Sequence, residues 1–359
     1  MSTQQNFVTV IPSQARRIIE KTLDFNKGKP GKGRQNILIV GPSATAKSAN
    51  AEQVGEDRKM PVLIGVVSIQ EPTDVGGLPF KHLTLDGREI GKHLLFEFMD
   101  KIVEAKQECI VILEEVGQAP FAVQAAWMHP IWAREINGHK VSDYVNFIIL
   151  TNSREDMAGV QGIISTLSLR CTVLRMASGA ALAPDFLTWG KKNGIHPYVL
   201  AYIDAHNNKI HIPAPNRDMI NFPCYRTWEF VSNKLYMDLE KRDMLPAIAG
   251  DIGDTEAMEF ISWMRISERI PHWRDIIKDP MTAPVPAGNE ASILYALCIT
   301  LSRIADKDTW PAIYKYSSRI SKEYQTWLVN ETMLQKPDLM ETEEFIKWAG
   351  ENHKIHIRK

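Results

Sequence analysis

The sequence has almost no net charge, no long apolar run and no secretory leader. Its 42 basic and 43 acidic residues leave the 359-residue chain with a formal net charge of −1, which argues against a surface dedicated to polyanions. No stretch approaches the roughly 20 consecutive apolar residues that a membrane-spanning helix needs. The N-terminus also lacks the charged start and apolar run of a secretory signal. These absences predict a cytoplasmic protein without a membrane span.

Paired cysteines are also lacking. The four cysteines are far apart in the chain: Cys109, Cys171, Cys224 and Cys298. Because no two of them form a C-x-x-C pair, we expect reduced thiols rather than a disulfide framework or a zinc site. His206 and His211 have no carboxylate or cysteine at ligand spacing, so no metal site is expected there either.

The chain is long enough for two or three packed units. Four short apolar runs in its first half are separated by longer polar or helical segments: residues 37–40, 62–67, 110–113 and 146–151. Strands buried on both faces have this pattern. A helix is expected over residues 13–23, before the first run. The first half therefore predicts an α/β fold with a central parallel sheet between helices.

The second half has a different character. All nine tryptophans lie at or beyond Trp127, and strong strand runs end near residue 176. Helical spacing recurs over residues 293–304 and again over residues 313–328, and residues 281–290 have the composition of a linker. We expect an α/β core over 1–176, a small helical lid over 177–265 and a helical extension over 266–359.

A phosphate-binding loop is expected after the first strand. The segment ILIVGPSATAKSAN contains a strand, a loop and a helix start, with the loop residues Gly41, Pro42, Ser43, Ala44, Thr45, Ala46, Lys47 and Ser48. Backbone N–H groups and the helix dipole would bind phosphates there, with Lys47 at the terminal phosphates and the Ser48 hydroxyl on Mg²⁺. The usual pattern has glycine at position 46. Alanine suits a helical φ there and is costly if φ is positive.

Two carboxylates follow the third apolar run, in the segment CIVILEEVGQAP. Acids at the end of a buried strand need a partner, and a Mg²⁺-nucleotide provides one. Glu114 would bind the metal through water, and Glu115 would orient or deprotonate the attacking water. The usual pair begins with aspartate. Glu114 is one methylene longer, which is compatible with a slow enzyme.

With these motifs in order, the sequence resembles the AAA+ ATPase superfamily and, within it, the MoxR-like branch. The resemblance covers about residues 1–240 and is strengthened by four more segments: EPTDVGGLPF (71–80), NFIILTNSRED (146–156), STLSLRCTVLRM (165–176) and FPCYRTWEFVS (222–232). It implies a P-loop NTPase core of three αβα layers, followed by a helical lid and a C-terminal helical extension. It also implies binding of ATP and Mg²⁺ and hydrolysis of ATP.

The resemblance assigns roles to further polar residues. Asn152 would position the hydrolytic water, although it could also cap the turn after its strand. Arg170, or its rival Arg175, would act on the nucleotide of a neighbouring subunit, and Arg226 would lie over the bound nucleotide or serve only in packing. Glycines 76 and 77 suit either a mobile loop facing a pore or a plain turn.

The family implies a homo-oligomeric ring, usually a hexamer, because one subunit's arginine completes another's site. The expected activity is chaperone-like remodelling of a protein client, often one with a von Willebrand A-type domain. A nucleic-acid motor is the alternative, and the absence of a basic-aromatic stripe argues against it. A nucleotide-gated scaffold with weak hydrolysis is a third hypothesis, which Ala46 and Glu114 keep open.

Overall fold

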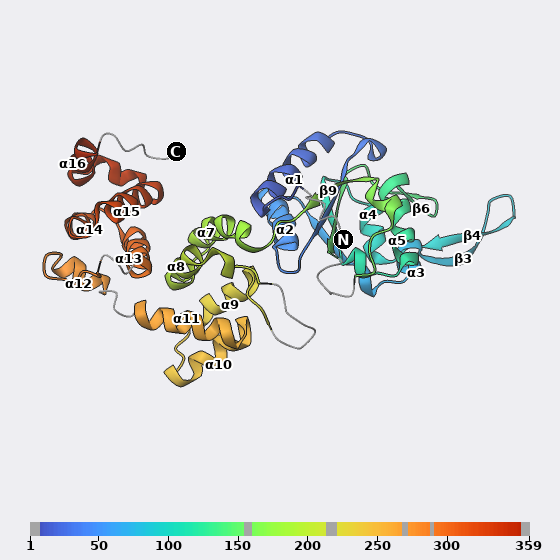
Figure 1. The fold of residues 1–359 in the computed structure, drawn as a ribbon. Coiled ribbons are helices and arrows are strands. Elements are labelled where there is room, and N and C mark those ends of the chain that lie inside the picture. Colours follow the sequence, from blue (N-terminus) through green and yellow to red (C-terminus); the bar gives the residue numbers. More distant parts are fainter. Residues whose placement is uncertain (1–7, 154–159, 213–220, 268–271, 288–290, 353–359) are drawn as a thin grey trace. The chain divides into compact units, whose positions relative to one another are not determined.

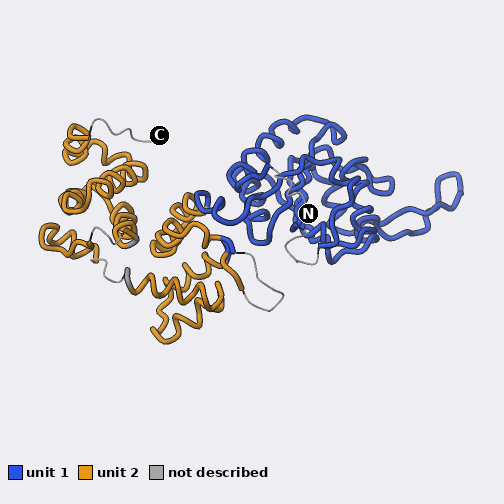
Figure 2. Tube along the Cα trace, in the orientation of Figure 1, with its two compact units in different colours: residues 1–185, 211–219, 224–226 blue, residues 186–210, 220–223, 227–359 orange. Residues whose placement is uncertain are grey.

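The computed structural model describes residues 8–153, 160–212, 221–267, 272–287 and 291–352. The chain divides into two compact units (Figure 2). Unit 1 contains residues 1–185, 211–219 and 224–226, and unit 2 contains residues 186–210, 220–223 and 227–359. The chain therefore passes between the units several times. The predicted three-part division into core, lid and extension stays a prediction.

Unit 1 is built on a five-stranded sheet. Its strands are β1 (Asn36–Gly41), β2 (Val62–Val66), β5 (Cys109–Glu114), β8 (Val145–Asn152) and β9 (Cys171–Arg175). Their order is β2-β5-β8-β1-β9, and every neighbouring pair is parallel. All five strands thus end at one edge of the sheet, the carboxyl edge, and begin at the opposite amino edge.

Helices cover both faces of this sheet (Figure 1). Side chains alternate between faces along a strand, so Ile37 and Ile39 pack with α1 (Pro12–Asn26) and α2 (Lys47–Asp57). Leu38 faces the other way, into a cluster with α3 (Pro72–Gly76), α4 (Glu97–Val103), α5 (Phe121–Met128) and α6 (Ser165–Ser168). Because β1 is apolar at four successive positions, 37 to 40, it can fill both clusters.

The predicted fold class is confirmed in its architecture: a central parallel sheet lies between two layers of helices, and further helices follow it in the chain. The four apolar runs are β1, β2, β5 and β8, and the expected first helix is α1. The fifth strand, β9, lies in the segment that the sequence marked only as a possible arginine-finger region. Residues 172 and 173 of β9 are exposed, so it has no continuous buried run to reveal it.

The segment between β2 and α4 contains a β-hairpin that the sequence did not predict. Helix α3 ends at Gly76, and β3 (Leu78–Leu83) pairs antiparallel with β4 (Glu89–Leu94). Gly77 has φ 80°, and a Cβ there would lie 2.6 Å from the carbonyl oxygen of Leu94, so a turn at this point requires glycine. The hairpin extends outward from the rest of unit 1 (Figure 1). A smaller hairpin pairs β6 (Glu135–Ile136) with β7 (His139–Lys140).

The regular secondary structure of unit 2 is entirely helical among its described residues. After α7 (Ala183–Lys192), which begins in unit 1, it contains α8 (Pro197–Ala205), α9 (Tyr225–Tyr236), α10 (Lys241–Ile252), α11 (Asp254–Ser267), α12 (Trp273–Lys278), α13 (Ala291–Ile304), α14 (Trp310–Ser317), α15 (Lys322–Gln335) and α16 (Glu343–Glu351). Among the described helices of both units, none is long and apolar enough to cross a membrane.

The second half of unit 2 packs on its first half through polar contacts as well as apolar ones. Arg303 of α13 donates a hydrogen bond to the carbonyl oxygen of Ile195 at 3.0 Å, and Lys191 forms an ion pair with Glu331 at 2.5 Å. The spacing over residues 313–328 belongs to two helices, α14 and α15, rather than one. In the expected linker, over residues 281–290, Tyr316 and Arg319 donate hydrogen bonds to the carbonyl oxygens of residues 284 and 283, and Arg319 also donates to that of residue 280 just before it. This part of the linker is therefore anchored.

Candidate nucleotide-binding site

The expected phosphate loop lies at the carboxyl edge of the sheet, between β1 and α2. Helix α2 begins at Lys47 without a side-chain cap, so its N-terminal amides point toward the loop. Ala44 and Ala46 both have left-handed backbones, with φ of 57° and 61°. The question left by the sequence is therefore answered: residue 46 needs a positive φ, and alanine there costs about 1 kcal/mol relative to glycine.

Lys47 is buried and held at the end of β1. Its Nζ donates hydrogen bonds to the carbonyl oxygens of Gly41 at 2.9 Å and Pro42 at 2.6 Å, and to Oδ1 of Asn152 at 3.0 Å. The parallel register pairs Gly41 directly with Asn152. The structure thus brings together two expected site residues that are 105 positions apart. The last three residues of the segment 146–156 lie outside the described residues.

The two acids lie where β5 ends. Glu114 is the last residue of β5, half-buried, and Glu115 follows in a left-handed conformation with φ 56°. Oε2 of Glu115 accepts a hydrogen bond of 2.5 Å from the hydroxyl of Ser68. Gly117 allows close approach to the neighbouring strand, since a Cβ there would lie 2.2 Å from Oγ1 of Thr151.

A third carboxylate, Glu52 of α2, lies close enough to Glu114 for their charges to interact. Burial, then the charges of Glu114 and Glu56, raise the pKa of Glu52. No ion pair among the described residues neutralises Glu52, Glu114 or Glu115. A site that concentrates negative charge in this way favours a bound cation.

These residues fit a Mg²⁺ ion held chiefly by phosphates and water. Ser48 is the second residue of α2 and half-buried. Glu114 lies close to α2, because its charge raises the pKa of Glu52 on that helix. The described residues contain no cluster of three or more acidic, histidine or cysteine ligands. Mg²⁺ needs only one or two protein oxygens when it is bound with a nucleotide, so the donor set matches that ion.

The candidate arginines lie at opposite edges of the sheet. Arg175 ends β9 and pairs in register with Val40, at the carboxyl edge. Arg170 precedes β9, whose first residue pairs with Asn36 at the start of β1, so on the order of 15 Å of strand separates it from the loop. Its guanidinium lies over the exposed ring of Trp132 at 5.1 Å and donates to the carbonyl oxygen of Thr166.

Arg226 is exposed at the second position of α9. It groups with unit 1, and so does its neighbour Tyr225, whose hydroxyl donates to the carbonyl oxygen of Leu182 at 2.5 Å. This hydrogen bond connects the first residue of α9 to the segment that follows β9. The role of Arg226 toward a nucleotide stays a prediction.

Sequence reasoning missed three residues that the structure brings to this site: Ser68, Glu52 and His211. Ser68 and His211 are far from the loop in sequence, and no local motif marks them. Glu52 could have been found as one helical turn beyond Ser48 on α2. His211 is buried, and its Nε2 lies 3.1 Å from the carbonyl oxygen of Ser43.

Comparisons with known proteins found no matching family model and no matching curated protein. Among solved structures, two variants of RuvB from Thermotoga maritima are similar, each at 13% identity. One has a TM-score of 0.40 over 96% of this chain and 95% of that one, and the other 0.36 over 97% and 96%. NtrX from Brucella abortus is 16% identical, with a TM-score of 0.34 over 72% of this chain and 66% of that one. Likeness at this level carries no argument about activity.

Proposed function

We propose that this chain is an ATP-hydrolysing AAA+ protein of the MoxR-like kind, which assembles into a ring and remodels a protein partner. The observation that carries the proposal is the position of Lys47. Its ammonium group is held between the end of β1 and Asn152, beside a loop whose helix begins uncapped. This arrangement suits terminal phosphates, which would replace the carbonyl and amide oxygens as acceptors.

The residues around this lysine divide the work of hydrolysis. Asn152 orients the water, and Glu115 takes its proton, once the hydrogen bond from Ser68 to Glu115 is released. Ser48 and Glu114 hold the metal ion. When bound, Mg²⁺ neutralises charge that develops on the transferred phosphoryl group. Because like charges crowd Glu52 and Glu114, the acids favour the metal-loaded site.

The trans-acting arginine in this proposal is Arg170 rather than Arg175. Arg170 lies at the edge of the sheet away from its own loop, so it can reach only the site of another subunit. Arg175 lies beside its own β1. The exposed side chains of Trp132 and Leu169 adjoin Arg170 and would be covered by that neighbour. A head-to-tail contact of this kind closes into a ring, which we propose to be a hexamer.

The test is the ATPase rate per subunit against protein concentration, for the wild type, Arg170→Ala and Arg175→Ala. We expect a rate that rises with concentration, collapses in Arg170→Ala by about 10³-fold and survives in Arg175→Ala, while all three bind ATP. A concentration-independent rate that does not need Arg170 would rule out the shared site. If the rate collapses only in Arg175→Ala, then Arg175 rather than Arg170 is the trans-acting arginine.

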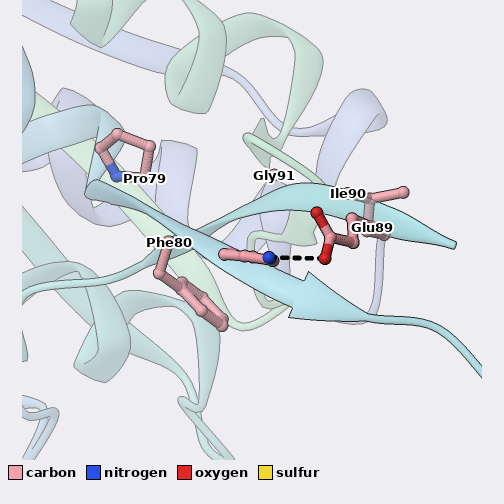
Figure 3. Close-up of a pocket in the computed structure, with 6 residues that line it drawn as sticks. Pro79, Phe80, Glu89, Ile90 and Gly91 are labelled. Carbon is pink, nitrogen blue, oxygen red and sulfur yellow. Dashed lines mark ion pairs between the residues drawn. The ribbon is translucent and has the colours of Figure 1, made fainter. Parts of the chain in front are cut away.

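The β3–β4 hairpin is the surface that we propose contacts the partner. Opposed residues share a face, so Phe80, Ile90 and the pair of Leu78 with Leu94 line one side of the ribbon. All four are exposed, as is Leu85 at the tip. The other side carries the ion pair between Lys81 and Glu89 (Figure 3). The first side also carries His82 and Lys92, and the second also carries the exposed Leu83. A ribbon with this many exposed apolar side chains suits a polypeptide partner, and the proposed client is a protein with a von Willebrand A-type domain.

Stimulation of the ATPase by an added polymer tests this assignment. The probes are an unfolded protein (reduced, carboxymethylated α-lactalbumin) and a single-stranded oligonucleotide. We expect the unfolded protein to stimulate the wild type, and Phe80→Ser and Leu85→Ser to lose the stimulation while keeping the basal rate. Ile346→Ser, a change of another exposed apolar residue in unit 2, is the matched control. Stimulation by the oligonucleotide with a steep salt dependence would favour the nucleic-acid motor instead.

The nucleotide-gated scaffold is favoured by one observation, the left-handed backbone of Ala46. A strained loop with weak affinity and slow turnover would act through nucleotide occupancy alone. ATP-dependent assembly, measured by light scattering together with no detectable phosphate release, would identify that alternative.

A further inference from the structure

His211 contacts the phosphate loop from a part of the chain that no motif connects to it. It follows α8 and a short 3₁₀ segment (Asn207–Lys209), where the chain returns to unit 1. Its side chain is buried, with only 2% exposed, and Nε2 lies 3.1 Å from the carbonyl oxygen of Ser43. A carbonyl oxygen can only accept, so Nε2 is the protonated nitrogen and donates this hydrogen bond.

The carbonyl oxygens at the start of the loop all have donors. Lys47 donates to those of Gly41 and Pro42, Thr45 donates to that of Pro42 at 2.9 Å, and His211 donates to that of Ser43. In a planar trans peptide, the carbonyl and the following N–H point in opposite directions. A donor on the carbonyl of Ser43 therefore aims the N–H of Ala44 away from His211.

This peptide is held in a conformation that the sequence does not favour. Ala44 has φ 57°, a region that costs a residue with a Cβ about 1 kcal/mol or more. Rotating the peptide between residues 43 and 44 by half a turn would move φ of Ala44 to about −120°, an ordinary extended value. The same rotation would break the hydrogen bond from His211 and turn the amide of Ala44 around.

We propose that His211 is a positioning residue for phosphate binding. Its hydrogen bond keeps the peptide between Ser43 and Ala44 in the left-handed orientation, so the N–H of Ala44 is directed to the phosphates. This inference rests on the proposed nucleotide-binding function. It extends the site to a segment that enters directly from unit 2, and it assigns the histidine to the loop conformation rather than to proton transfer.

Two amide substitutions at this position form a matched pair. The side-chain nitrogen of His211→Gln can reach the place of Nε2, whereas that of His211→Asn reaches only the place of Nδ1. Affinity for ATP and ADP is measured by titration with a fluorescent nucleotide and competition. We expect His211→Gln to bind within about twofold of the wild type and His211→Asn to bind about tenfold more weakly, the effect of one lost hydrogen bond.

The substitution Ala44→Gly separates positioning from simple packing. Glycine adopts a positive φ at no steric cost, so the loop no longer depends on His211 to hold it. Ala44→Gly should therefore recover most of the lost affinity in the His211→Asn background. A packing defect would not respond to a change at residue 44, and equal affinity of His211→Asn and the wild type would overturn the inference. If thermal unfolding shows that His211→Asn is not folded, His211→Leu replaces it, with the same expected loss of affinity and the same expected recovery by Ala44→Gly.

Failure of the inference and of the proposed function give different results. If the wild type binds no nucleotide, the proposed function is wrong. If the wild type binds and Lys47→Ala does not, while substitutions at His211 have no effect on affinity, only the role of His211 is wrong.

Discussion

Both edges of the central sheet carry buried or half-buried polar groups, but the two sets are organised in opposite ways. At the amino edge, Arg34 forms a two-pronged ion pair with Glu108, at 2.8 and 2.7 Å. Asn146 accepts from Arg34 at 3.1 Å and donates to Glu108 at 2.9 Å. Burial alone would raise the pKa of Glu108, yet the hydrogen bonds from Arg34 and Asn146 hold that pKa below its ordinary value. The set is matched in charge.

At the carboxyl edge, the acids are not matched by ion-pair partners. Glu52, Glu114 and Glu115 form no ion pair among the described residues, and the pKa of Glu52 is raised by burial and then by the charge of Glu114. Two alanines there have left-handed backbones. The difference teaches that the amino edge is organised for stability, while the carboxyl edge keeps charge and strain that a ligand would relieve.

The largest expected effect breaks the carboxyl edge alone. Lys47→Ala should abolish ATP binding and hydrolysis, because it removes the only cation that the loop holds among the described residues. Its thermal unfolding should change little. Lys278→Ala, an exposed lysine in unit 2, is the control. Micromolar affinity for ATP in Lys47→Ala would contradict the assigned site.

A change to the charge of the carboxyl edge should affect rate and not binding. Glu115→Gln keeps the shape and loses the proton acceptor, so we expect hydrolysis to fall by 10²- to 10⁴-fold, roughly the contribution of a general base. ATP affinity should be retained, and assembled rings should accumulate with ATP. Glu135→Gln, an exposed glutamate, is the control. Normal turnover by Glu115→Gln would mean that another carboxylate accepts the proton.

The amino edge should respond in the opposite way. Arg34→Met leaves Glu108 and Asn146 without their partner, and we expect the free energy of unfolding to fall by about 3 kcal/mol, as for a broken buried pair. The affinity of the folded variant for nucleotide should equal that of the wild type. Arg242→Met is the control, because the side chain of this ion-paired arginine is 79% exposed. Chemical denaturation should show almost no change in its free energy of unfolding.

The pH dependence sharpens this contrast. The pKa of Glu108 is lowered in the folded protein, so its contribution is present above the ordinary carboxyl pKa and is lost as pH falls through the lowered one. The stability difference between the wild type and Arg34→Met should therefore shrink on acidification below about pH 4. A difference that is independent of pH would mean that packing of the arginine stem, not its charge, is responsible.

The smallest expected effect tests the strain at the carboxyl edge. Ala46→Gly relieves a left-handed alanine, and we expect it to stabilise unit 1 by about 1 kcal/mol in thermal unfolding. Ala49→Gly, at an exposed position inside α2, should destabilise by a similar amount. Equal destabilisation by both substitutions would show that Ala46 is not strained.

The strands that could be predicted are the four short apolar runs, β1, β2, β5 and β8. β1, β5 and β8 are continuous apolar runs, and the order of the motifs along them indicates which residues share the carboxyl edge. Lys47 and Asn152 could be expected to meet because parallel strands end together, and they do. The packing of α1 against the sheet likewise follows from its stripe of Ala15, Ile19 and Leu23.

The rest could not be predicted because its determinants are not local. β9 is an edge strand in which residues 172, 173 and 175 are exposed, and the β3–β4 hairpin has no buried run on either strand. The break between α14 and α15 interrupts a spacing that continues through it. Ser68 and His211 reach the site only through tertiary contacts. The sign of φ at Ala46 depends on the loop conformation, which the residue type alone does not specify.

The repeated passage of the chain between units 1 and 2 limits how the protein can be divided. A polypeptide ending at residue 185 contains the whole sheet, yet it lacks His211 and the segment 224–226, which also belong to unit 1. Such a fragment, or one produced by proteolysis between residues 186 and 210, would lose the histidine that contacts Ser43. The proposed nucleotide-binding module is therefore discontinuous in sequence. In recombination or gene fusion, it could be inherited intact only together with the helices inserted within it.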